Sequence, residues 1–321
     1  MILVSLYAIT IPYATMRKDR VESRITVEVL VNMVRHQRCL VRKRKFVSEI
    51  KKTIELDLFR KRLIILKFVG LILFMDKNLE DLILKTKPEI IVHAAAYTDV
   101  DGCEVNKEYA WKVNVNATRS VVRAAKIIKS YLVYVSTDYV FDGDKGYYTE
   151  EDLPNPINFY GLTKLIAEEH VKASDLLYLV IRPSAIYGTG PGKLNFATFI
   201  ANRLSEGKEV KALVDQFVSP TLNTLLARTI VEAVELKPIG VFHVAGERMS
   251  RYDFAIEVAE ALNLPRELIR KTTMDEMKWR ARRPKDSSLN TVKARKIFKT
   301  KFFDNKLALK IFAEEYRSRV R

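Results

Sequence analysis

A tyrosine and a lysine four positions apart, Tyr160 and Lys164, are the residues of this chain best suited to act together in chemistry. On a helix, positions i and i+4 share one face, so the ammonium would lie beside the phenol. A nearby positive charge lowers the pKa of a phenol from its usual value of about 10. A strand-end hydroxyl, from Thr137 or less favourably Ser136, could hold a carbonyl oxygen next to that phenol. This group predicts proton donation to a carbonyl while a cofactor delivers hydride.

Two predicted elements must position these side chains. Residues 132–135 form an apolar run that predicts a buried strand, and residues 136–138 follow at its carboxyl end. A loop with turn residues leads from there to the helix that carries Tyr160 and Lys164. The bare Tyr-x-x-x-Lys pattern is common, so the interpretation depends on the sequence around it.

The spacing of apolar residues predicts further elements on both sides. Residues 90–93 predict a buried strand, and the apolar stripe over residues 105–129 predicts one long helix. Residues 176–186 predict another buried strand, and Ser250 is placed to cap a helix that begins at Arg251. Strands that alternate with helices favour an α/β fold with a parallel sheet.

The surrounding motifs resemble those of the dTDP-4-dehydrorhamnose reductase family, within the extended short-chain dehydrogenase/reductase superfamily. The motifs, which occur in order over most of the chain, are His93-Ala-Ala-Ala-Tyr-Thr-Asp-Val-Asp101, Asn114, Ser136-Thr-Asp-Tyr-Val-Phe-Asp-Gly143, Tyr160-Gly-Leu-Thr-Lys164, Arg182-Pro-Ser184, Asp215-Gln216, Ser219-Pro-Thr221, His243-Val-Ala-Gly246, Arg283-Pro284 and Ser287-Ser-Leu289. The resemblance does not extend to residues 1–75.

The resemblance implies a Rossmann-like doubly wound parallel sheet with a smaller α/β substrate-binding lobe. Residues 1–180 would form the NAD(P)-binding lobe, in which 1–75 are divergent and basic. Residues 181–321 would form mainly the substrate-binding lobe, interleaved with the first. The implied activity is the reduction of a 4-keto-6-deoxy sugar nucleotide by NADPH or NADH, a step of dTDP-L-rhamnose biosynthesis.

The resemblance also implies a role for particular residues. Tyr160 would donate the proton, Lys164 would lower the tyrosine pKa and bind the nicotinamide ribose, and Thr137 would polarise the carbonyl. The implied cofactor-binding residues are Asp57, Ala94, Ala95, Tyr97, Asn114, Tyr160 and Lys164. The implied substrate-binding residues are Asp138, Val140, Phe141, Asp215, Gln216, Thr221 and Arg283.

The first lobe departs from the family because it has no glycine-rich loop. Only glycine lets the backbone approach a pyrophosphate closely at a helix amino terminus, and the first glycine of the chain is Gly70. Three explanations stay open. The loop has been lost or replaced, as by a shifted reading frame; Ser5, Thr15 and the basic residues 17–24 meet phosphates by charge; or the lobe has a non-catalytic binding role.

The missing loop supports a second hypothesis from a different class. A close relative of these reductases is the regulatory subunit of methionine adenosyltransferase, so the chain could be a non-catalytic binding protein of that type or a paralogue with impaired cofactor binding. The presence of Thr137, Tyr160 and Lys164 favours the enzyme. The implied partner of the enzyme is a nucleotide sugar.

The charge of the chain raises a third, weaker hypothesis. The net charge is +16, and residues 1–75 contain 16 Lys and Arg against 6 Asp and Glu. An excess of this kind could bind nucleic acid, but a dense basic run such as residues 42–45 is usually a solvated face. The excess lies where the family resemblance is absent.

Cysteine content and hydropathy indicate a cytoplasmic protein. Cys39 and Cys103 are the two cysteines, and no partner His lies at ligand spacing, so neither a disulfide framework nor a metal site is predicted. Residues 1–14 lack a basic start, and residues 63–75 are shorter than the roughly 20 apolar residues that span a bilayer. Family members often form homodimers and some use magnesium, although no motif here establishes either property.

Overall fold

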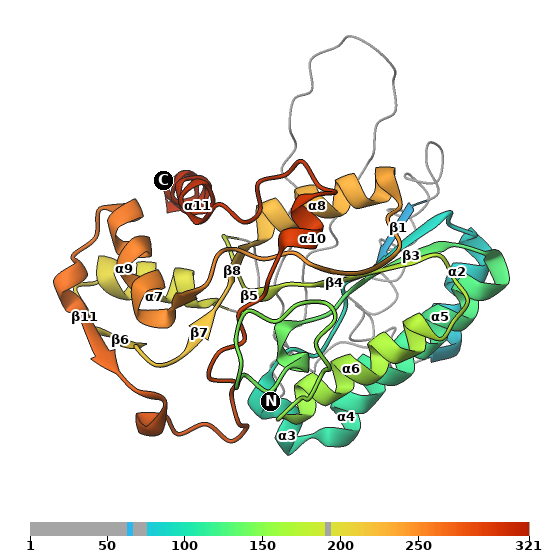
Figure 1. Ribbon diagram of the computed structural model, residues 1–321, viewed down its shortest axis with the longest axis horizontal. Helices are drawn as coiled ribbons and strands as arrows, with labels where there is room; N and C mark the ends of the chain where they lie inside the picture. The colour runs from blue at the N-terminus through green and yellow to red at the C-terminus, as the bar shows by residue number, and fades with distance from the viewer. Residues whose placement is uncertain (1–62, 67–75, 190–193, 321) are drawn as a thin grey trace, which may run out of the picture.

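A five-stranded parallel sheet forms the centre of the molecule (Figure 1). The computed structural model describes residues 63–66, 76–189 and 194–320, so the expectations for Asp57, Cys39 and the rest of residues 1–62 lie outside it. The strands, in their order across the sheet, are β1 (Leu63–Leu66), β2 (Ile90–His93), β3 (Tyr131–Val135), β4 (Tyr178–Arg182) and β9 (Gly240–His243). Each neighbouring pair is parallel, which confirms the predicted α/β fold.

Helices cover both faces of the sheet, because successive side chains of its strands point to opposite faces and are apolar on both. Ile91 and Leu132 pack into the layer below the sheet in Figure 1, whereas Val92 and Val133 pack into the layer above it. The lower layer consists of α2 (Asp76–Thr86), α5 (Ala117–Ile128) and α6 (Phe159–Lys172). The upper layer includes α8 (Asn223–Leu236) and α10 (Val292–Arg295). No helix in the described part of the chain is long and apolar enough to cross a bilayer.

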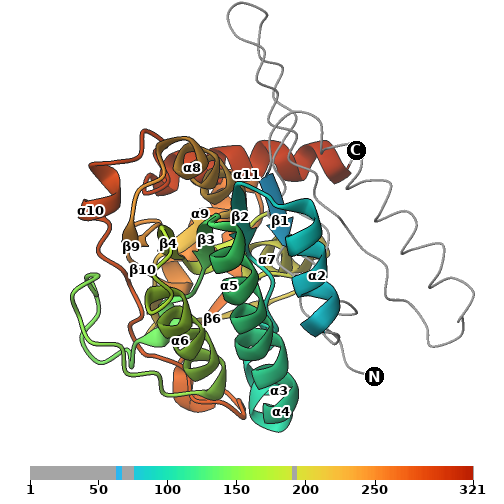
Figure 2. The same ribbon diagram turned by 90° about the vertical axis from the view of Figure 1, so that its right-hand side faces the viewer.

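A second group of short strands and helices lies beside the carboxyl end of the sheet (Figures 1 and 2). The strand pairs are β5 (Ser184–Tyr187) with β8 (Pro220–Leu222), β6 (Val210–Leu213) with β11 (Ile269–Thr272), and β7 (Phe217–Val218) with β10 (Met249–Ser250). The helices are α7 (Phe196–Ser205), α9 (Arg251–Leu262) and α11 (Asn305–Val320). Ser250 caps α9 as predicted, since its hydroxyl accepts a hydrogen bond from Asp253 N at 2.9 Å.

The structure divides one of the predicted elements and confirms another. The single strand predicted over residues 176–186 is wrong, because Pro183 has no N–H to continue a ladder and β5 pairs with β8 instead of the central sheet. The single helix predicted over residues 105–129 is confirmed as a continuous helical run from Lys107 to Ile128. It contains a π-helical turn (Lys112–Asn116) between α4 (Lys107–Trp111) and α5, and it is preceded by a separate helix, α3 (Val100–Val105).

A segment near the end of the chain, residues 280–289, crosses from the second group of elements to the first. We call it the closing segment. Its backbone bonds to the loop after β3, with Asp286 N donating to Gly143 O at 2.9 Å and Tyr148 N donating to Ser288 O at 2.9 Å. It also bonds to β7, where Phe217 N donates to Lys285 O at 2.8 Å. The closing segment therefore ties the two parts of the molecule together at the carboxyl end of the sheet.

A buried ion pair joins α6 to the sheet. Arg182, at the end of β4, and Glu168, on α6, are 1% and 0% exposed. Arg182 donates from Nη2 to Glu168 Oε2 at 2.6 Å and from Nε to Glu168 Oε1 at 3.0 Å. The Ser136 hydroxyl, just after β3, also donates to Glu168 Oε1. Two strand ends and one helix face are thus held by a single carboxylate.

Breaking this pair on one side should destabilise the fold strongly. Arg182→Met leaves the Glu168 carboxylate buried without its cation, for which we expect a loss of about 3–5 kcal/mol in the free energy of unfolding. Denaturant titration measures it. Lys126→Met is the control, because the Lys126–Asp175 pair is exposed and its loss should cost at most about 1 kcal/mol. Equal losses for the two variants would contradict the assignment.

Candidate active site

The three predicted catalytic side chains meet at the carboxyl end of β3. Thr137 follows the strand, and Tyr160 and Lys164 lie on the face of α6 that packs against it. Lys164 Nζ donates to Val135 O, the last carbonyl of β3, at 2.8 Å. The Thr137 hydroxyl is close enough to the Tyr160 phenol to influence its pKa by hydrogen bonding. All three side chains are buried.

A glycine lets α6 come close to the strand end. Asn158 begins the helix as its cap, accepting a hydrogen bond from Gly161 N at 2.8 Å. A Cβ atom at Gly161 would lie 2.1 Å from Tyr139 O, in the 3-10 turn Asp138–Val140 that follows Thr137. Any larger residue would push the helix away from this turn. The glycine of the Tyr160-Gly161 motif therefore sets how near Tyr160 lies to Thr137.

Burial changes the pKa values of both catalytic groups on the helix. It lowers the pKa of Lys164 from 10.5 to about 7, and the Glu168 carboxylate opposes this shift. Burial raises the pKa of Tyr160 above its ordinary value of 10, and the hydrogen bond with Thr137 opposes this shift. The net shift is upward because desolvation is its largest cause, so the lowering by Lys164 that the resemblance implied stays a prediction. The phenol is protonated at neutral pH, as a proton donor must be.

The predicted cofactor residues after β2 are held by Asn114. Its Oδ1 accepts from Tyr97 N at 2.7 Å, and its Nδ2 donates to Tyr97 O at 3.1 Å and to Thr163 Oγ1 at 2.9 Å. Asn114 lies in the π-helical turn, a local insertion that is frequent at functional sites. Ala94 and Ala95 directly follow β2, at the same edge of the sheet as Thr137. Asn114 thus braces the chain after β2 against the helix that carries Tyr160.

Several predicted substrate-binding side chains point into the protein. Val140, Phe141 and Thr221 are each 0% exposed. Phe141 stacks on Tyr148 with ring centroids 4.2 Å apart, and Thr221 donates from Oγ1 to Ser184 O at 2.7 Å. These residues shape the wall of the site, and in this structure their side chains have no surface that a substrate could touch.

Asp138 is also enclosed. Its Oδ2 accepts from Ser184 Oγ at 2.8 Å and from Ser287 Oγ at 2.6 Å, while Oδ1 accepts from Thr137 Oγ1 at 3.1 Å. Sequence reasoning missed both serines as site residues. Both serines lie in quoted motifs, but nothing local connects Ser287 with Asp138, which is 149 positions away. Glu168 was missed too, although its place one helical turn after Lys164 was a usable signal.

The other predicted substrate residues lie around the closing segment. Asp215 accepts hydrogen bonds from Met274 N at 3.0 and 3.1 Å. Gln216 donates from Nε2 to Pro284 O at 3.1 Å and accepts from Arg251 Nε at 3.3 Å. Arg283 pairs with Asp101 of α3, with Nη2 and Oδ2 3.0 Å apart. The Arg283 guanidinium therefore joins the closing segment to the first lobe in this structure.

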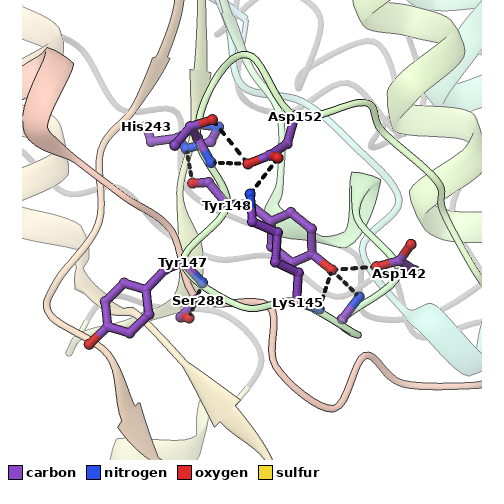
Figure 3. A network of polar contacts seen from close by, with 9 residues as sticks. Asp142, Lys145, Tyr147, Tyr148, Asp152, His243 and Ser288 are labelled. Atoms are coloured by element: carbon purple, nitrogen blue, oxygen red, sulfur yellow. Dashed lines mark hydrogen bonds and ion pairs between the residues drawn. The ribbon is translucent and has the colours of Figure 1, made fainter.

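The loop after β3 is fixed by a polar network (Figure 3). The Tyr148 hydroxyl accepts from Gly143 N at 3.0 Å and Lys145 N at 3.1 Å, and it donates to the Asp142 carboxylate. Tyr148 O contacts His243 Nδ1 of β9 at 3.0 Å. The loop is held in place from both the sheet and the closing segment.

Among the described residues, no cluster of three or more His, Cys, Asp or Glu side chains is arranged to hold a metal ion. The magnesium that the family resemblance implied therefore has no support in this part of the chain.

Comparison with known protein families shows which family this chain belongs to. The family model of the RmlD substrate binding domain matches residues 73–318, most of the chain. The chain belongs to this family, that of the dTDP-4-dehydrorhamnose reductases. The match begins where the sequence resemblance begins, after the divergent first residues.

Curated relatives include reductases and a methionine adenosyltransferase subunit. The dTDP-4-dehydrorhamnose reductase of Escherichia coli K12 is 34% identical over 66% of this chain and 74% of its own length. Methionine adenosyltransferase 2 subunit beta of Rattus norvegicus is 33% identical over 71% of this chain and 70% of its own length.

Solved structures show the same fold. A hypothetical dTDP-4-dehydrorhamnose reductase from Sulfolobus tokodaii has 47% sequence identity and a TM-score of 0.67, covering 72% of this chain and 81% of that one. The dTDP-4-dehydrorhamnose reductase from Bacillus anthracis, solved in complex with NADP, has 29% identity and a TM-score of 0.71, covering 76% of this chain and 86% of that one.

The described residues fit the nicotinamide end of an NAD(P) molecule. Among them, Val135 O accepts a hydrogen bond from Lys164 Nζ, and the ammonium also lies 4.2 Å from the centroid of the Tyr134 ring. The remaining donor capacity of the ammonium suits a ligand hydroxyl. Ala94 and Ala95 at the end of β2 are small, although Ala95 is itself packed in the core. The residues expected to hold the pyrophosphate and adenine, including Asp57, lie outside the described part.

The lowered pKa of Lys164 should be visible in the pH dependence of stability. Between about pH 7 and 10.5, the unfolded lysine binds a proton that the folded one has lost. The free energy of unfolding of the wild type should then rise with pH relative to Lys164→Met, by up to about 1.4 kcal/mol per pH unit. Denaturant titrations without cofactor from pH 7 to 9.5 measure the difference. A difference that is flat or falls with pH would contradict the assignment.

Proposed function

We propose that this chain reduces a 4-keto-6-deoxy sugar nucleotide of the dTDP type with NADPH or NADH, the reaction that gives dTDP-L-rhamnose. The observation that carries the proposal is the buried group of Thr137, Tyr160 and Lys164 at the carboxyl end of β3. Ligands bind at this edge in open α/β sheets. Membership of the reductase family supports the substrate class.

Each catalytic residue has a role that follows from its surroundings. A bound nicotinamide dinucleotide supplies the hydride, which adds to the keto carbon. Tyr160, protonated because burial raises its pKa, gives its proton to the keto oxygen as negative charge develops there. The Lys164 ammonium, one helical turn away on the same face, stabilises the phenolate that is left. Thr137 orients the phenol, and the buried position of the group excludes water.

We propose further that the enzyme acts in the cytoplasm as a homodimer. A chain with two cysteines and no predicted disulfide suits a reducing compartment. The family resemblance supports the dimer.

A second candidate function is a non-catalytic binding protein like methionine adenosyltransferase 2 subunit beta. Two observations favour it: the identity of 33% to the rat protein, and the absence of any glycine before Gly70. The buried Tyr160 and the hydrogen-bonded Lys164 beside it on α6 favour the reductase, since a binding role does not need them.

Cofactor titration separates these functions. We expect purified chain to bind NADPH or NADH with a dissociation constant in the micromolar range, followed by nicotinamide fluorescence. Turnover of dTDP-4-keto-6-deoxy-L-mannose, recorded as loss of absorbance of the reduced cofactor, is the second measurement. Absence of binding at millimolar cofactor would refute the reductase and leave the binding protein.

Removing the phenolic hydroxyl of Tyr160 should abolish most of the catalysis without weakening cofactor binding. We expect Tyr160→Phe to lower kcat by about 10²- to 10⁴-fold, the usual contribution of a positioned general acid. Tyr178→Phe is a matched control, because Tyr178 begins β4 at the opposite end of the sheet. Its kcat should equal that of the wild type. A Tyr160→Phe variant with wild-type kcat would remove Tyr160 from the mechanism.

A further inference from the structure

Three hydroxyl groups converge on the Asp138 carboxylate, which is 2% exposed. Thr137 Oγ1 lies 3.1 Å from Oδ1, and the hydroxyls of Ser184 and Ser287 lie 2.8 and 2.6 Å from Oδ2. Burial raises the pKa of Asp138, and the three hydroxyls oppose this shift because they donate to the ionised carboxylate, which only accepts hydrogen bonds. The side chain is fully engaged inside the protein and has no free oxygen directed at a ligand.

The three hydroxyls come from three different parts of the chain. Thr137 follows β3, Ser184 begins β5, and Ser287 belongs to the closing segment. Ser184 is fixed in turn, because its N–H donates to Thr221 Oγ1 at 3.2 Å and its hydroxyl accepts from Ser219 N at 3.2 Å. The Asp138 backbone is held as well, with its N–H donating to Pro183 O at 2.9 Å. Asp138 is therefore the point at which the strand end, β5 and the closing segment are joined.

This arrangement decides the orientation of the Thr137 hydroxyl. Its single proton is donated to Asp138, and one of its two lone pairs accepts from Tyr139 N at 3.2 Å. The second lone pair is left for another donor, and the Tyr160 phenol is close enough to hydrogen-bond with Thr137. Asp138 thus fixes the atom that orients the proton donor.

We propose that Asp138 is a positioning residue for the reduction: it fixes the Thr137 hydroxyl, and through Ser287 it makes the geometry of Thr137 and Tyr160 depend on the seating of the closing segment. This inference rests on the proposed reductase function. It differs from the direct substrate contact that the family resemblance implied for Asp138. Asp138 acts on the reaction through Thr137 alone.

Asparagine at this position cannot do the same. Its amide has one oxygen, which accepts about two hydrogen bonds, and an NH₂ group that only donates. In Asp138→Asn at least one of the three hydroxyls must turn away. The shape of the site is otherwise kept.

A kinetic double-mutant cycle tests the proposal, with Thr137→Val, Asp138→Asn and the double variant assayed against wild type. We expect Asp138→Asn to lower kcat by about 10- to 100-fold, the scale of a small misplacement, and to change KM for the sugar nucleotide less than about threefold. In the Thr137→Val background it should lower kcat by less than about twofold, because the two effects are coupled. A large rise in KM, or equal losses in both backgrounds, would overturn the proposal.

Asp142→Asn is the matched control for the cycle. Asp142 is a carboxylate four residues along the same loop, bonded to the Tyr148 hydroxyl and to Asp144 N, with no bond to Thr137. Its effect on kcat, whatever its size, should be the same with and without Thr137→Val. A coupling as large as that of Asp138 would show that the cycle reports general damage to the loop, and would overturn the proposal.

The link to the closing segment is tested by stability, which requires no turnover. Ser287→Ala removes one hydroxyl. The factor by which it changes the equilibrium constant of unfolding should be at least about fivefold larger in the wild-type background than in the Asp138→Asn background. If Asp138→Asn does not fold, the Ser287→Ala and Ser184→Ala variants should still lower kcat with unchanged KM. Absence of coupling overturns the inference even in an active enzyme. Coupling in a chain that shows no turnover overturns the proposed function, and with it the catalytic part of this inference.

Discussion

The ion pair between Arg182 and Glu168 holds together the elements on which the site depends. Tyr160, Lys164 and Glu168 follow one another at four-residue intervals on α6, so fixing Glu168 orients the whole face. Arg182 ends β4, and Ser136 directly follows β3, the strand that delivers Thr137. Because a bidentate buried pair tolerates little displacement, the catalytic hydroxyl and the catalytic phenol keep a constant separation.

Burial is the second constraint, and it acts on charge. A site closed to water makes ionisation of Tyr160 and protonation of Lys164 unfavourable at once, which is why the pKa of the phenol rises and that of the amine falls. The same low dielectric strengthens attraction between opposite charges formed during reaction. Before reaction the site therefore holds a neutral Tyr160 phenol and an easily deprotonated Lys164 ammonium. Proton transfer from Tyr160 to a substrate oxygen creates a phenolate, which the Lys164 ammonium can stabilise.

The closing segment gives the second lobe its influence on the site. It contacts the first lobe by charge at Asp101 and Arg283, by a backbone acceptor where Asn158 donates to Arg282 O at 3.0 Å, and by Ser287 at Asp138. The sequence suggested that Arg283 could bind a phosphate, but in the structure its guanidinium pairs with the Asp101 carboxylate. This arrangement suits an enzyme that binds a nucleotide sugar between its two parts. It also suits a non-catalytic binding protein in which the joined parts form a surface for a partner. The complete proton-donating group favours the enzyme.

The sequence alone determined the parts of this protein that depend on local spacing. Apolar runs predicted the parallel strands, and the positions of Thr137, Tyr160 and Lys164 placed them on a strand end and one helix face. Tertiary structure alone decided the pKa of Tyr160, because the shift comes from desolvation by surrounding elements that no local pattern shows. It also decided that Asp138 meets Ser287 from 149 positions away, and that the chain after Pro183 leaves the central sheet. Local periodicity records which face of an element is apolar, whereas burial and long-range partners arise only when distant segments pack.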